Sequence, residues 1–122
     1  MDEEQFKART KKLALRVLRL VEVLPRSRTA DVIGRQLLRA ATSVGANYRA
    51  ACRARSVAEM IAKLGIVEEE ADETLYWLEL LVEARLMPES RLADLMQEAD
   101  EIVAMTVVSI KTLRARGRKP HT

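Results

Sequence analysis

The chain has 122 residues, of which 48% are hydrophobic and 32% charged, with only four aromatic residues, four glycines and three prolines. A chain of this length can bury one core without disulfide or metal support. The lone cysteine, Cys52, excludes an internal disulfide, and the single histidine, His121, lies next to the terminus and leaves no basis for catalysis by histidine. So few turn-forming residues, with abundant Ala, Leu, Arg and Glu, are typical of long helices.

The net charge of +3 is unevenly distributed. Residues 1–61 carry 13 basic and 6 acidic side chains, residues 62–110 carry 3 and 12, and residues 111–122 carry 5 and none, which gives +7, −9 and +5. This segregation predicts either a basic surface for a polyanion or complementary faces that meet each other. The apolar runs are far shorter than the roughly 20 residues of a membrane span. Because no signal-type leader is seen either, we expect a cytoplasmic protein.

Two helices are expected in the first half of the chain. Acidic residues open the segment from Asp2 to Leu24 and apolar residues then recur at helical spacing, which predicts an amphipathic helix ended by Pro25. Thr29 is the expected N-cap of a second helix that runs to about Ala54. Gly45 lies inside this helix at a cost of about 1 kcal/mol relative to alanine, so we expect it to permit a close helix crossing.

A third helix is expected directly after the second. The sequence SVAE, from Ser56 to Glu59, is a capping box, in which Ser56 accepts from the third helical amide and Glu59 reaches back to the Ser56 amide. Glu68 stands where the apolar repeat of this helix calls for an apolar residue. The expected core positions are Ile61, Leu64, Ala71, Leu75, Leu78 and Val82.

Pro88 suits the first turn of a fourth helix, whose apolar stripe continues to Leu113. Four helices with short connections predict an all-α, antiparallel up-down-up-down four-helix bundle over residues 1–115, because short loops force neighbours to be antiparallel. Residues 116–122 form a basic tail without apolar pattern, which we expect to be disordered.

Residues suited to catalysis are scarce. The acidic run Glu68–Glu73 could suggest a carboxylate-bridged di-metal site, but such sites in bundles also need Glu-x-x-His pairs, for which no histidine is available. Cys52 has arginines nearby, which lower a thiol pKa, but its place on the apolar repeat favours a buried core residue over a nucleophile. No phosphate-binding loop is present. We therefore expect no enzyme activity, no cofactor and no metal.

Basic residues are the remaining functional candidates. Arg35 and Arg39 are four residues apart on the second helix, and so are Arg49 and Arg53, so each pair shares one face and could contact several phosphates. The predicted nucleic-acid-binding residues are Arg16, Arg19, Arg35, Arg39, Arg49, Arg53, Arg55, Lys111, Arg114, Arg116, Arg118 and Lys119. The alternative is that these side chains solvate the bundle, or pair with the acidic third and fourth helices of the same or a neighbouring subunit.

The segment LYWLELL places Tyr76 beside Trp77, and both cannot point inward on one helix. An aromatic residue facing out of a small bundle often marks a subunit contact. We expect the other one to lie in the core or a groove.

The sequence QLLRAATSVGANYRAACRARS, followed by AEMIAKLGIVEEEADETLYWLELL, resembles the small four-helix-bundle proteins found as open reading frames within intervening sequences of bacterial large-subunit ribosomal RNA genes. Their relatives include the accessory proteins of diversity-generating retroelements. The resemblance covers roughly residues 6–114. Many members read Asn-Ile-Ala-Glu-Gly where this chain has NYRAA, so a role of that Glu-Gly pair does not carry over. The family-like structural polar residues are Ser43, Asn47, Ser56, Glu59 and Glu73.

The resemblance implies a bundle that assembles into a ring, typically a homopentamer, with a basic surface for nucleic acid. In the retroelement branch, it also implies a reverse transcriptase as partner. The sequence-based hypothesis is therefore a non-enzymatic, oligomeric module that binds RNA or an RNA/DNA hybrid through Arg and Lys contacts to phosphates, with no membrane partner. The alternative is a protein–protein scaffold without nucleic-acid binding, in which the basic second helix docks on acidic helices of a neighbour.

Overall fold

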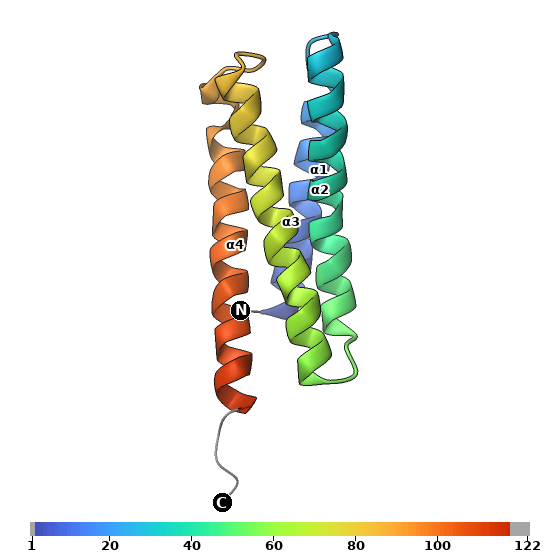
Figure 1. Cartoon of the computed structure of the whole chain (residues 1–122), viewed down its shortest axis with the longest axis vertical. Helices are drawn as coiled ribbons and strands as arrows, with labels where there is room; N and C mark the ends of the chain where they lie inside the picture. The colour runs from blue at the N-terminus through green and yellow to red at the C-terminus, as the bar shows by residue number, and fades with distance from the viewer. Residues whose placement is uncertain (1, 118–122) are drawn as a thin grey trace, which may run out of the picture.

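The structure, a computed structural model, describes residues 2–117 and consists of four antiparallel helices without strands in that range (Figure 1). They are α1 (Glu3–Glu22), α2 (Arg28–Cys52), α3 (Val57–Glu83) and α4 (Glu89–Gly117). The predicted all-α four-helix bundle is confirmed. The turn between α2 and α3, the start of α1 and the last turns of α4 lie at one end of the bundle, which we call the α2–α3 end. Helix α4 continues to Gly117, and the remaining predicted tail, residues 118–122, lies outside the described residues.

The second helix begins earlier than expected. Its N-cap is Ser27, whose Oγ accepts a hydrogen bond from the Ala30 amide at 3.1 Å, while Thr29 already lies within the helix. The prediction of Thr29 as N-cap is therefore wrong. Serine is the stronger capping residue, and Ser27 has the extended backbone that a cap requires.

The capping box of α3 forms with one bond displaced. Ser56 Oγ accepts from the Glu59 amide at 3.0 Å, as predicted. Glu59 Oε2, however, accepts from the Arg55 amide at 3.1 Å rather than from the Ser56 amide. The Glu59 carboxylate thus accepts from the amide one residue before the expected Ser56 amide, within the turn between α2 and α3.

A close approach of α1 and α2 is confirmed at Gly45. A Cβ atom at this position would lie 3.3 Å from Oγ1 of the buried Thr10, and 3.5 Å from the Thr10 carbonyl carbon. Glycine therefore allows the α2 backbone to pack directly on α1. Among the neighbouring helix pairs, α1 and α4 contact each other least.

The buried face of α3 is turned slightly from the predicted one. Val67 is buried where the predicted stripe met Glu68, and Ile61, Leu75 and Val82 are only half-buried. The interruption at Glu68 is thus a matter of register. The buried residues of α3 are Leu64, Val67, Ala71, Thr74, Leu78 and Leu81.

Candidate nucleic-acid interface

Five exposed arginines lie along the outer face of α2, and we call them the arginine row. At 3.6 residues per turn their positions fall within an arc of about 80°, and the row is about 37 Å long. Arg28 was not among the predicted site residues, although its spacing of seven from Arg35 places it on the same face. The arginine row consists of Arg28, Arg35, Arg39, Arg49 and Arg53.

Arg39 is held by acidic residues of α3. Its Nη1 lies 3.0 Å from Glu70 Oε2 and its Nη2 donates to Glu73 Oε1. Trp77 Nε1 donates to the same Glu73 oxygen at 3.1 Å. The hydrogen bond from Arg39 is the main reason that the pKa of Glu73 lies below its usual range. Arg39 therefore pairs with the acidic third helix of its own chain, which was the alternative to phosphate binding. This pairing makes the positive charge of Arg39 less available to an outside phosphate.

Arg35 is paired more weakly. Its Nη2 lies 2.9 Å from Asp31 Oδ2, one turn earlier on α2, and both side chains are exposed. Exposed pairs of this kind contribute little, about 0.3–0.5 kcal/mol. Arg35 therefore remains available to an external anion.

The row ends in free arginines at the α2–α3 end. Arg49 is exposed on the last turn of α2, Arg53 is the exposed C-cap residue of α2, and Arg55 is exposed in the following turn. No carboxylate of residues 2–117 lies within 4.0 Å of these three guanidinium groups. They are the predicted residues that best fit an anion-binding surface.

The arginine row is bordered by a hollow at its other end. This hollow, of about 690 Å³, lies at the connection between α1 and α2. Arg26, Arg28 and Arg35 line it together with Asp31. Cationic side chains therefore gather at both ends of the outer face of α2.

The basic residues of α1 are not joined to the arginine row as a group. Arg16 is half-buried, and its charge, with that of Lys12, helps to lower the pKa of Glu98 on α4. Arg16 thus faces the acidic part of α4. Arg19 is exposed on α1.

Three of the five predicted basic residues near the end of the chain lie on the described part of α4. Lys111, Arg114 and Arg116 are exposed near the end of the helix, but of these only Arg116 lines the adjacent groove. Arg118 and Lys119 lie outside the described residues.

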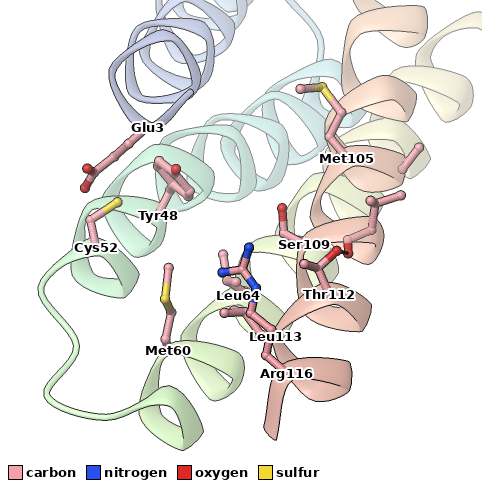
Figure 2. A pocket seen from close by; sticks show the side chains of 12 residues that line it. Glu3, Tyr48, Cys52, Met60, Leu64, Met105, Ser109, Thr112, Leu113 and Arg116 are labelled. Atoms are coloured by element: carbon pink, nitrogen blue, oxygen red, sulfur yellow. Dashed lines mark hydrogen bonds between the residues drawn. The ribbon is translucent and has the colours of Figure 1, made fainter. Parts of the chain in front are cut away.

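That groove, about 740 Å³ in volume, opens between the last turns of α4 and the α2–α3 hairpin, and we call it the end groove (Figure 2). Glu3, at the start of α1, lies at its edge, and Arg116 points into it from α4. Its walls are mostly apolar, and include Tyr48, Cys52, Met60, Leu64, Met105 and Val108.

Cys52 is half-buried in the wall of the end groove rather than fully buried in the core. Burial, and next the interaction with Glu3, raise the pKa of its thiol. The arginines that follow it do not create a thiolate. Cys52 is therefore a poor nucleophile in this structure.

No group of three or more His, Cys, Asp and Glu side chains within residues 2–117 is placed to hold a metal ion. None of the described helices is long and apolar enough to span a membrane. The arginine row and the end groove are therefore the candidate binding surfaces of residues 2–117.

The sequence profile of the 23S rRNA-intervening sequence protein family matches residues 3–108. The chain belongs to this family. It is also similar to the crystal structure of a protein of unknown function from the S23 ribosomal protein family of Bacteroides thetaiotaomicron, with a TM-score of 0.84 and 34% identity over 91% of this chain and 99% of that chain. No curated protein matches the sequence. The resemblance drawn from the sequence is thus confirmed at the level of the family.

The family-like polar residues of this intervening sequence protein have local partners. Asn47 Nδ2 donates to the Ser43 carbonyl oxygen at 2.9 Å, within α2. Glu73 holds Arg39 and Trp77, and Ser56 and Glu59 shape the turn before α3. Each therefore has a structural contact within the chain.

The two adjacent aromatics face different environments, as expected. Trp77 is half-buried against the hydrophobic core and donates to Glu73. Tyr76 is 55% exposed, and its ring meets the Trp77 ring edge-on with 5.0 Å between the ring centres. Tyr76 therefore presents an aromatic side chain on the outer face of α3.

Proposed function

We propose that this member of the family is a non-enzymatic module that binds RNA or an RNA/DNA hybrid through arginine contacts to phosphates. The observation that supports it is the arginine row together with Arg55 in the adjacent turn, because the guanidinium groups of Arg49, Arg53 and Arg55 have no carboxylate partner in residues 2–117. A strand of B-DNA carries one phosphate per 3.4 Å. A row of about 37 Å is close to one helical turn of such a duplex, about 34–36 Å, so its arginines can contact phosphates on either side of a groove.

The surrounding surface favours backbone contacts over base reading. Sequence-independent binding to single strands usually employs aromatic side chains as stacking platforms. Tyr76, the exposed aromatic residue of the described chain, lies on α3 among acidic residues, which disfavour a nucleic-acid strand there. We therefore expect weak sequence preference and strong dependence on salt.

Fluorescence anisotropy tests this function. An RNA hairpin, an RNA/DNA hybrid and duplex DNA, each labelled, are titrated between 50 and 200 mM salt. We expect a Kd of about 1 μM or lower at low salt, with log K falling by about 0.9 per phosphate contacted for each tenfold increase in salt. Absence of binding to all three at 50 mM salt would refute the proposal.

A charge-matched pair of variants locates the interface. We expect the triple substitution Arg49→Ala, Arg53→Ala and Arg55→Ala to weaken binding at least tenfold and to reduce the salt slope by about 2–3. Lys11→Ala, Lys12→Ala and Arg91→Ala remove the same charge from exposed positions outside the row. Equal losses in both triple variants would show that only net charge matters.

We also propose that copies of the chain associate with each other. The supporting observation is that apolar side chains are exposed on three helices: Leu15 and Leu18 of α1, Tyr76 of α3 and Val108 of α4. A ring would repeat the arginine row and multiply a modest affinity. Because Arg39 is bound within its own chain, Arg35→Glu is the cleaner test of contacts by α2 with a neighbour. Light scattering with this variant separates a scaffold from a nucleic-acid module: a scaffold dissociates, while a binding module stays assembled and loses RNA.

The pentameric state, a reverse transcriptase partner and a cytoplasmic location stay predictions. A reverse transcriptase gene beside this one, or an insertion within a ribosomal RNA gene, would distinguish the two branches of the family.

A further inference from the structure

The end groove exists because α1 is short. Helix α1 has 20 residues and α4 has 29, and α4 reaches past the first residue of α1 at the α2–α3 end (Figure 1). The last turns of α4 therefore have no fourth helix beside them. Apolar side chains that a longer α1 would cover remain accessible, and Val108 is 62% exposed.

The shape of the end groove suits a helix. Its α4 wall repeats every three or four residues from Met105 through Thr112 to Arg116, which corresponds to a length of about 17 Å. The opposite wall consists of Tyr48 and Cys52 of α2 and Met60 and Leu64 of α3. Methionine side chains adapt well to an inserted partner.

The charge of the groove restricts its occupant. Arg116 points into the groove from α4, while Glu3 lies at the edge beside Cys52. A basic helix would be repelled by Arg116 at the α4 wall. The outer face of α1 in a second copy, where Leu15 and Leu18 lie among Lys11, Lys12 and Arg19, therefore fits the α4 wall less well than an acidic face does.

The outer face of α3 has the complementary chemistry. It exposes Tyr76 and Ile66, which are ten residues and thus about 15 Å apart along the helix, close to the length of the groove wall. Between and beyond them lie the exposed acidic residues Glu69, Asp72 and Glu79. Residues 2–117 therefore contain both an apolar groove with Arg116 on its α4 wall and an apolar ridge with acidic flanks.

We infer that the end groove of one copy binds the outer face of α3 of a second copy, with Tyr76 inserted between the walls and Asp72 paired with Arg116. This inference rests on the self-association proposed above and is independent of nucleic-acid binding. The groove and the α3 face are different surfaces, so the contact is heterologous and can repeat from copy to copy, closing a ring if the rotation allows it.

Two exposed positions test the contact in the full chain without nucleic acid. We expect Tyr76→Ala, which removes the inserted side chain, and Val108→Glu, which places an acid in the groove, to give particles near the 13.8 kDa chain mass in light scattering, well below wild type. Val32→Glu, at an exposed apolar position of α2 outside the groove, is the matched control and should keep the wild-type mass. Circular dichroism verifies that each variant is folded.

Mixing the two variants distinguishes this contact from other modes of assembly. Tyr76→Ala retains an intact groove and Val108→Glu retains an intact α3 face, so an equimolar mixture should form one contact and stop at twice the 13.8 kDa chain mass. The charge exchange Asp72→Arg with Arg116→Glu should restore the assembly that either change alone weakens.

Three outcomes would overturn the inference: a monomeric wild-type chain at 100 μM, wild-type mass in both variants, or a mixture that stays monomeric. RNA binding is measured separately with the Arg49, Arg53 and Arg55 triple variant. Failure of the groove contact is therefore distinguishable from failure of the nucleic-acid function.

Discussion

Arg9 of α1 and Glu98 of α4 are joined by two parallel hydrogen bonds, with Nε 2.7 Å from Oε2 and Nη2 2.8 Å from Oε1. The side chains are only 30% and 19% exposed. Arg9 also donates to Glu101 Oε1 at 2.9 Å and to Met105 Sδ at 3.0 Å. In residues 2–117 the side-chain hydrogen bonds between α1 and α4 all involve Arg9. Arg9 therefore connects the neighbouring helix pair that has the fewest contacts.

A double-mutant cycle measures what the Arg9 pair contributes. From Arg9→Gln, Glu98→Gln and the double variant, we expect a coupling free energy of about 1–2 kcal/mol in urea unfolding, because the two-point geometry strengthens a charged hydrogen bond. The exposed pair Lys7–Glu4, at 3.4 Å, serves as control and should give less than about 0.5 kcal/mol. Equal coupling energies for both pairs would contradict the prediction.

Stability should fall in acid through the same carboxylates. Hydrogen bonds from Arg9 and Arg39 hold the pKa values of Glu98 and Glu73 below the usual 4.5. A group whose pKa is lower in the folded state stabilises the fold above its unfolded pKa, and this contribution is lost as the pH falls through the folded value. We expect the urea midpoint to decline from about pH 4.5 downward, and Glu98→Gln to flatten that decline. A profile unchanged by Glu98→Gln would assign the acid loss to other groups.

The helices and the close crossing at Gly45 could be predicted from local sequence signals. The ion-pair partners of Arg39 and Arg9 could not, because they are distant in the sequence. The capping serine of α3 and the close contact at Gly45 depend on sequence neighbours and side-chain size. The partners of Arg39 are 31 and 34 residues away, and Glu98 is 89 residues from Arg9, so only the packed bundle brings them together. The predicted and the observed buried positions of α3 both repeat every seven residues, but Thr74 is buried in place of Leu75. Thr74 Oγ1 donates to the Glu70 carbonyl oxygen at 2.8 Å, so this polar residue can be buried, which the apolar pattern does not reveal.

Arg39 and Arg35 should behave differently although they occupy the same row. Arg39→Ala leaves Glu70 and Glu73 close together without their cation, and we expect a loss of about 1 kcal/mol in unfolding free energy, because two partly exposed bonds are lost together. Arg35→Ala breaks only an exposed pair and should change stability by less than about 0.5 kcal/mol. In RNA titrations the order reverses, and Arg35→Ala should weaken binding more. If the two variants have equal stability, the bond between α2 and α3 is not structural.

The crossing at Gly45 should reject a larger side chain. Gly45→Leu places side-chain atoms where a Cβ alone approaches Thr10 within 3.3 Å, so we expect a loss of about 1–3 kcal/mol from overpacking. Gly65 is the matched control, because a Cβ there meets nothing within 4 Å. Gly65→Ala should stabilise the chain by up to about 1 kcal/mol through helix propensity. Thermal unfolding of both variants tests the difference, and tolerance of leucine at Gly45 would refute the close crossing.

The reactivity of Cys52 reports on the end groove. Burial raises the pKa of its thiol, and the neighbouring Glu3 adds to this effect, so less thiolate is present at pH 8 than in the unfolded chain. We expect reaction with a disulfide reagent to be at least tenfold slower in the folded chain than in urea, and Glu3→Gln to accelerate it. If a second copy fills the groove, the rate should also fall as protein concentration rises, and Val108→Glu should abolish this dependence. A rate that equals that of the unfolded chain would mean that Cys52 is exposed and that the groove is open in solution.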